Sequence, residues 1–265
     1  MDGLPSILEL LDLEYIEENI YRSCVTFAEP HRLFGGQVAA QALYAAGKTV
    51  PAGRLPHSLH GYFLRAGDAH RPTLFRVDRD RDGGASSARR VVAIQNGEVI
   101  FNMAASFARR RVIDEPLLDR DATATGPFPA IGDLPAHKYP RHPSFEFRHQ
   151  LSTDRLPERF WIRCVEPLPA AEDDPLLHAA LLTYISDISS GLIRLEPPGY
   201  TASSSIDHAV WLHRQARMDG WIWQEMRPET AAGGRGWYTG ACYHPDGTRV
   251  ASIAQEALFR KTVTT

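Results

Sequence analysis

The sequence predicts an α+β protein made of two similar units, each with one central helix and an antiparallel sheet. Three observations favour this fold class. Strand-like segments recur about 150 residues apart, two hairpin turns recur at the same separation, and each half of the chain contains one strong helical segment. With 265 residues, of which 43% are hydrophobic, the chain can build one large domain or two modest ones.

The repeated strands are residues 57–65 and 206–214, which both alternate apolar and polar side chains and close on Leu and Arg. The repeated hairpins are residues 90–109 and 237–260. Their turns contain Asn96-Gly97 and Asp246-Gly247, dipeptides that tolerate the positive φ of tight hairpins. Gly97 and Gly247 lie 150 residues apart, so we interpret the chain as a duplicated unit.

Each half also has one predicted helix. The first follows Gly35-Gly36-Gln37 and runs to about Val50, with a face of small residues, and Pro51 ends it. The second begins near Asp174-Pro175, because acidic residues and proline suit a first helical turn, and it runs to about Ser190. Helices rich in alanine can lie close against a sheet.

The segment between the halves is rich in proline and glycine and predicts a surface linker. We therefore expect an N-terminal unit at 1–110, a linker at 111–141 and a C-terminal unit at 142–265. A helix wrapped by an antiparallel sheet is a hotdog unit, so the expected architecture is a double hotdog.

Composition excludes several classes of function. The net charge of −3 gives no sign of nucleic-acid binding. Three widely spaced cysteines favour neither a disulfide framework nor a metal site. We expect no cofactor. The acidic N-terminal segment does not fit a signal peptide, and no apolar run fits a membrane span. We expect a cytoplasmic protein.

Five blocks resemble the acyl-CoA thioesterase II family, and they occur in order over nearly the whole chain outside the linker. They read FGGQVAAQAL (34–43), HSLHGYFLRAGD (57–68), RRVVAIQNG (89–97), IDHAVW (206–211) and VASIAQE (250–256). The resemblance implies a double-hotdog enzyme of lipid and fatty acid metabolism, which hydrolyses acyl-CoA to free fatty acid and CoA.

The resemblance also implies a catalytic set of Asp187, Ser205 and Gln255. Serine stands where the family more often has threonine, and it keeps the hydroxyl group. The chemistry is consistent with these residue types, since a carboxylate can accept a proton from water while an amide and a hydroxyl orient that water. No covalent intermediate is required.

Further candidates follow from position. Backbone N–H groups near Gly36 and Gln37, where the first helix begins, could hold the oxyanion. Close packing of the helix against the sheet explains Gly35 and Gly36 equally well. His60 is included as a substrate-positioning candidate. As a group, however, the strand histidines are more typical of structural histidines, and their spacing matches no metal motif. They are His57, His60, His208 and His213.

The phosphates of CoA could meet Arg65, Arg89 or Arg90, although exposed strand arginines are usually only solvated. Hotdog units commonly pair between subunits. The fused pair already forms one pseudo-dimer, and we expect a further homodimer or homotetramer.

Two alternative functions remain open at this stage. A non-hydrolytic acyl-CoA binding protein would keep the fold without turnover. A hotdog dehydratase or hydratase would need a catalytic histidine on a helix, and His178 lies about two turns before Asp187. The segment around Ser86 lacks the second glycine and the strand-to-helix elbow of a serine hydrolase, so that class is rejected.

Overall fold

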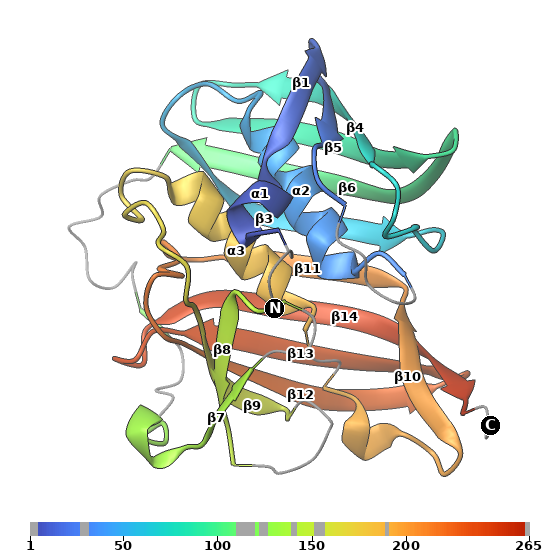
Figure 1. The fold of residues 1–265 in the computed structure, drawn as a ribbon, viewed down its shortest axis with the longest axis vertical. Helices are drawn as coiled ribbons and strands as arrows, with labels where there is room; N and C mark the ends of the chain where they lie inside the picture. Colours follow the sequence, from blue (N-terminus) through green and yellow to red (C-terminus); the bar gives the residue numbers. More distant parts are fainter. Residues whose placement is uncertain are drawn as a thin grey trace.

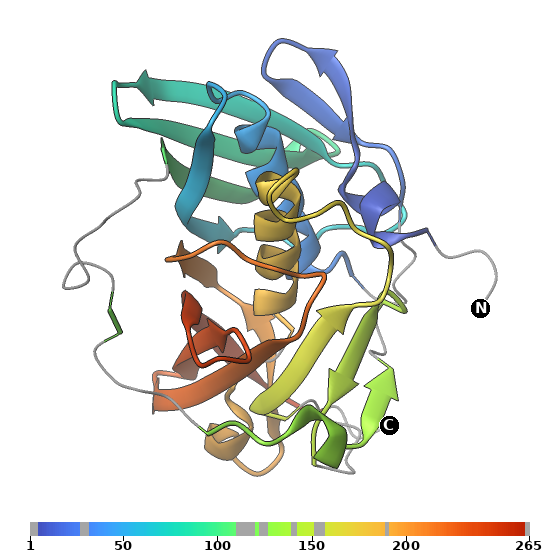
Figure 2. The same ribbon diagram turned by 90° about the vertical axis from the view of Figure 1, so that its left-hand side faces the viewer.

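The computed structural model describes residues 5–26, 32–109, 120–121, 127–138, 142–150, 157–188 and 191–262. Two helices run side by side through the middle of the molecule, with strands of the first half on one side and strands of the second half on the other (Figure 1, Figure 2). This arrangement confirms the predicted α+β double-hotdog fold.

The elements of the first half are α1 (Ile7–Leu11), β1 (Leu13–Glu17), β2 (Ile20–Ser23), α2 (Gly35–Gly47), β3 (Arg54–Phe63), β4 (Leu74–Asp82), β5 (Ser86–Gln95) and β6 (Glu98–Arg109). Those that follow are a 3-10 turn (Ile131–Asp133), β7 (Ala136–Lys138), β8 (Phe145–Arg148), β9 (Arg159–Cys164), α3 (Pro175–Ser186), a second 3-10 turn (Ile193–Leu195), β10 (Tyr200–Ser205), β11 (Asp207–Leu212), β12 (Ile222–Ala232), β13 (Arg235–Tyr243) and β14 (Arg249–Lys261).

The strands of the described residues form one sheet with the order β1-β2-β4-β5-β6-β3-β11-β14-β13-β12-β9-β8-β7, and β10 pairs with β14. The orders β4-β5-β6-β3 and β11-β14-β13-β12 mirror each other about the central β3–β11 pair. In that antiparallel pair Leu59 faces Val210 and Gly61 faces His208. Equivalent strands therefore take equivalent places, as a duplicated unit requires.

The two helices pack antiparallel inside this sheet. A Cβ atom at Gly36, near the start of α2, would collide with the backbone oxygen of Tyr184, near the end of α3. At the other end, a Cβ atom at Gly47 would meet the side chain of Leu176. Side chains of both helices and both halves join a single buried cluster, so the units share one hydrophobic core.

Both helices end earlier than the sequence indicates. The α2 helix ends at Gly47 rather than near Val50, and α3 ends at Ser186 rather than near Ser190. Asp187 is therefore the C-cap residue of α3, with backbone angles outside the helical range (φ −97°, ψ 8°). Residues 189–190 lie outside the described part of the chain.

Part of the predicted linker packs against the second half. Phe128 lies against the rings of Trp161 and Trp223, and Trp161 Nε1 donates a hydrogen bond to the backbone oxygen of Pro129 (2.9 Å). Strand β7 also falls within the segment predicted as linker, where it pairs with β8 at the sheet edge. Within described residues 127–138, Phe128 and Pro129 thus cover the outer face around Trp161 and Trp223, and β7 extends the sheet edge.

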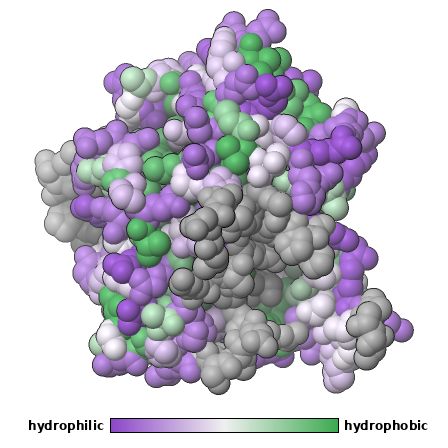
Figure 3. Space-filling view, viewed as in Figure 1, coloured by the Kyte–Doolittle hydropathy of each residue, from purple (hydrophilic) through white to green (hydrophobic). Residues whose placement is uncertain are grey.

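The surface is mixed in character. The face seen in Figure 3 shows small hydrophobic groups scattered among hydrophilic residues, with no broad apolar patch among its coloured residues. Within the described residues, no helix has the length and apolarity needed to cross a membrane.

The packing of α2 against α3 gives a first prediction. Gly→Ala in a helix normally stabilises by about 0.5–1 kcal/mol, but a methyl group at Gly36 must displace the backbone of α3. We expect Gly36→Ala to lower the free energy of unfolding by about 1–3 kcal/mol in urea denaturation. Gly84, around which a Cβ atom meets nothing within 4 Å, supplies the control: Gly84→Ala should change stability by less than about 0.5 kcal/mol. Equal stability of the two variants would contradict this packing.

Candidate active site

Asp187 is held at the end of a buried helix. The α3 helix starts at Pro175, with the Asp174 carboxylate accepting a hydrogen bond from the backbone N–H of Leu177 (3.0 Å). Nearly all of α3 is buried, so its end is fixed in position. A carboxylate at a helix C-terminus faces unfavourable partial negative charge, and it needs stabilisation from elsewhere.

Ser205 and Gln255 come to Asp187 from two paired strands. Gln255 lies on β14 at the point where this strand passes from pairing with β11 to pairing with β10. Its side chain is 2% exposed. Gln255 Nε2 lies 2.9 Å from Asp187 Oδ1 and 2.5 Å from Ser205 Oγ. Ser205 Oγ is 3.4 Å from Asp187 Oδ1. The structure thus brings together the three residues implied by the resemblance.

The start of α2 lies beside the other carboxylate oxygen. A Cβ atom at Gly35 would stand 2.7 Å from Asp187 Oδ2 and 2.9 Å from the Phe63 ring. The first intrahelical bond of α2 runs from Val38 N to Phe34 O (3.2 Å), so the N–H groups of Gly35, Gly36 and Gln37 precede the helical ladder. The positive end of α2 therefore meets the negative end of α3 at Asp187.

His208 is a member of this cluster that sequence reasoning classed as structural. It is fully buried on β11, with Nε2 2.7 Å from Ser186 Oγ and Nδ1 in contact with Gln255 Oε1. The alternation of β11 already indicates that His208 points inward. Only the register of β11 beside β14 puts it next to Gln255.

His60 does not join the cluster. It lies on β3 between the inward-facing Leu59 and Gly61, so its side chain projects from the outer face of the sheet. There its ring packs edge-on against the ring of Trp211, with centroids 4.8 Å apart. The prediction that His60 positions substrate is therefore corrected, because the sheet separates it from Asp187.

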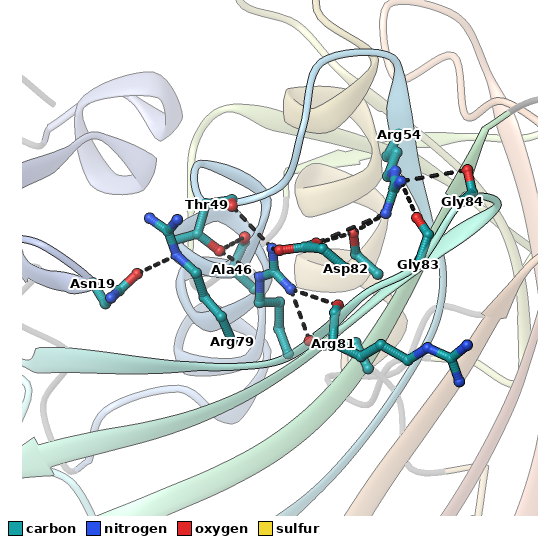
Figure 4. A network of polar contacts seen from close by, with 12 residues as sticks. Asn19, Ala46, Thr49, Arg54, Arg79, Arg81, Asp82, Gly83 and Gly84 are labelled. Carbon is teal, nitrogen blue, oxygen red and sulfur yellow. Dashed lines mark hydrogen bonds and ion pairs between the residues drawn. The ribbon is translucent and has the colours of Figure 1, made fainter.

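Arg89 is also unavailable to a ligand. Its side chain is fully buried and points toward the end of α2, where it bonds to Thr49 Oγ1 (2.8 Å) and pairs with Asp82 (2.8 Å). Figure 4 shows Thr49, Asp82 and Arg54 gathered in this polar network. Hydrogen bonds from Ser87 and from Arg89 lower the pKa of the Asp82 carboxyl, which favours its ionised form. We correct Arg89 from a CoA contact to a structural residue.

Arg65 and Arg90 are both exposed, but their surroundings differ. Arg90 projects from the outer face of β5 and pairs with Asp80 (2.9 Å) and Asp78 (3.5 Å). The sheet separates this face from Asp187, as it does for His60, and the prediction for Arg90 is corrected on that ground. Arg65 lies two residues after the end of β3 at Phe63, and it pairs with the exposed Glu98 (2.8 Å). It is exposed and lies two residues from Phe63, whose ring borders Gly35 beside Asp187.

Comparison with known proteins agrees with this fold and site. The family described as acyl-CoA thioesterase N-terminal domain matches residues 27–108, and the C-terminal domain family matches residues 115–259. An acyl-CoA thioesterase II from Mycobacterium marinum has a structure with a TM-score of 0.81 and 38% identity, covering 97% of this chain and 99% of that one.

Two further relatives extend the comparison. Acyl-CoA thioesterase 2 of Haemophilus influenzae is 31% identical over 98% of both chains. A hot dog fold protein from Alicyclobacillus acidocaldarius has a TM-score of 0.74 at 17% identity, over 96% of this chain and 98% of that one, which shows the shared fold.

The fold and these matches define a double-hotdog thioester hydrolase. The chain belongs to the acyl-CoA thioesterase II family.

Two buried histidines give a prediction for stability at acid pH. Burial lowers the pKa of His142 to about 4. Burial also lowers the pKa of His208, against the opposing charge of Asp187. The unfolded chain binds protons at these residues near a pH of about 6.5, whereas the folded chain resists protonation. The free energy of unfolding should therefore fall as the pH decreases from about 6.5 toward 4.

The fall can reach about 1.4 kcal/mol per pH unit for each histidine. Urea denaturation at pH 7, 6 and 5 measures it, and His142→Leu should make the dependence on pH shallower. A slope that this variant leaves unchanged would contradict the role given to His142.

Proposed function

We propose that this protein hydrolyses acyl-CoA thioesters to free acid and CoA through a water molecule activated by Asp187, with Ser205 and Gln255 orienting it. The observation that carries the proposal is the convergence of Gln255 Nε2 and Ser205 Oγ on one oxygen of Asp187. An amide N–H and a hydroxyl beside an ionised carboxylate form a site in which a water can donate to the carboxylate.

The reaction needs no covalent enzyme intermediate. Asp187 takes one proton from the water, and the resulting hydroxide forms a bond to the thioester carbonyl carbon. The tetrahedral intermediate then collapses, the C–S bond breaks, and the thiolate of CoA takes the proton held by Asp187. An alkyl thiolate is a good leaving group because the pKa of the corresponding thiol is low, about 8.5 for cysteine.

The start of α2 supplies donors for the developing oxyanion. The backbone N–H groups of Gly36 and Gln37 precede the helical ladder, and the adjacent Gly35 leaves room beside Asp187 Oδ2. A helix N-terminus directs such groups and its positive partial charge toward an anion. In this proposal, Asp187 activates the water while α2 stabilises negative charge on the carbonyl oxygen.

The dehydratase alternative has little support in the geometry. His178 is fully buried, and Nε2 is 2.8 Å from the backbone oxygen of Pro169 while Nδ1 accepts from Met218 N (3.0 Å). Both ring nitrogens are thus engaged in holding the start of α3. A binding protein without turnover would have no use for a buried amide and a hydroxyl directed at one carboxylate.

Assembly into a homodimer or homotetramer stays a prediction.

Asp187→Asn tests the general base. The amide keeps the shape of the side chain but cannot accept the proton of water, so kcat should fall about 10²–10⁴-fold. Thiol release measured over acyl-CoA chains of increasing length gives the rates. Asp133→Asn, the same change at an exposed site, should leave kcat unchanged. Undiminished turnover by Asp187→Asn would contradict the mechanism, and binding without release by the wild-type protein would contradict the activity.

Arg65→Ala tests the proposed contact with CoA phosphate. Loss of one charge-assisted hydrogen bond of about 1.5 kcal/mol should raise the KM for acyl-CoA roughly tenfold. Acyl thioesters of N-acetylcysteamine lack the phosphates, so their KM should not change. Arg90→Ala, an exposed arginine on the outer face, is the matched control with no effect on either substrate. An equal effect of Arg65→Ala on both thioesters would contradict the assignment.

A further inference from the structure

His208 occupies a place that the reaction does not explain. It is fully buried, and the proposed reaction assigns it no step. Its ring instead lies between Ser186 Oγ at the end of α3, 2.7 Å from Nε2, and Gln255 Oε1, which contacts Nδ1. The hydrogen-bond partners of a buried imidazole determine which of its two nitrogens carries the proton.

The directions of these hydrogen bonds follow from Asp187. An ionised carboxylate only accepts, so the group of Gln255 that faces it at 2.9 Å must be the amide nitrogen. The amide oxygen of Gln255 then faces His208, and since this oxygen also only accepts, Nδ1 of His208 must donate. Ser186 Oγ lies 2.8 Å from the backbone oxygen of Thr183 as well as 2.7 Å from Nε2, and its single proton can serve only one of these acceptors. In a neutral ring with its proton on Nδ1, Nε2 is an acceptor, and the hydroxyl proton of Ser186 goes to Nε2.

The neutral state of the ring agrees with its surroundings. Burial lowers the pKa of His208, while the charges of Asp187 and Asp207 and the bond to Gln255 act in the opposite direction. Asp207 Oδ1 is engaged with the backbone N–H of Glu256 (2.7 Å), which holds the junction of β10, β11 and β14 in place.

We infer that His208 is a positioning residue, which holds the amide of Gln255 so that its nitrogen faces Asp187 and Ser205. This inference rests on the proposed function. An amide rotated by 180° would direct its oxygen at the Asp187 carboxylate and its nitrogen at a ring N–H. The Nδ1–H of His208 stabilises only the orientation in which Gln255 Oε1 faces the ring. It thereby keeps Gln255 Nε2 directed at Asp187 and Ser205.

Two substitutions separate positioning from simple core filling. In His208→Asn the side-chain nitrogen can stand where Nδ1 stands and still donate to Gln255. His208→Leu has a similar size and cannot donate. We expect His208→Leu to lower kcat about 10–100-fold with KM within about threefold, because small displacements of catalytic groups cost this much. His208→Asn should retain most of the activity, and equal losses in the two variants would overturn the inference.

A double-mutant cycle shows whether His208 acts through Gln255. In a Gln255→Ala background no amide remains to be oriented, so His208→Leu should lower kcat no further. A residue with only a structural role would lower kcat by the same factor in both backgrounds, and that result would overturn the inference. Urea denaturation of each variant confirms that the rates refer to folded protein.

The protonated nitrogen can be read without any turnover. In protein labelled with ¹⁵N-histidine, the imidazole signals that disappear in His208→Asn belong to His208. They should show a neutral ring protonated at Nδ1, and a ring with no proton on Nδ1 would overturn the inference. If Asp187→Asn kept full activity, the proposed function would fail while this spectrum still decided the state of His208.

Discussion

The antiparallel packing of α2 against α3 is the constraint on which the site depends. Gly35 and Gly36 leave no side chain between the start of α2 and the end of α3, so the helices meet at backbone distance. The positive end of one helix thereby lies at the negative end of the other, beside Asp187. A carboxylate that would be unfavourable at the end of an isolated helix becomes tolerable here, because the positive end of α2 and the amide of Gln255 lie beside it.

The two halves have the same plan but have diverged at their helix ends. Lys48 caps α2 where Asp187 caps α3. The far end of the helix pair is closed by Leu176 against Gly47. The buried Arg89, which pairs with Asp82, fixes the chain that leaves α2 at Thr49. One end of the helix pair therefore carries polar groups around a carboxylate. The other end is closely packed, and its charged side chains are paired with each other.

The sequence predicts the repeated elements because strand alternation, hairpin turns and helix starts are local signals. Taken one at a time, Asp187, Ser205 and Gln255 have no local sequence pattern that identifies a catalytic residue. Only the resemblance to a family selects them. The errors have structural causes. Arg89 and Arg90 are adjacent on a strand and must point to opposite faces, a signal already present in the pattern. The contact of His208 with Gln255 depends on strand register and on the end of α3, which no local pattern encodes.

The site draws on both halves of one polypeptide, with α2 from the first and α3, β10, β11 and β14 from the second. In a protein assembled from separate subunits, such a composite site would be lost on dilution as the subunits dissociate. Covalent linkage makes the meeting of the halves intramolecular, with an effective concentration that dilution does not change. It also frees each half to mutate independently, so the asymmetry between the two helix ends could accumulate without forming mismatched pairs.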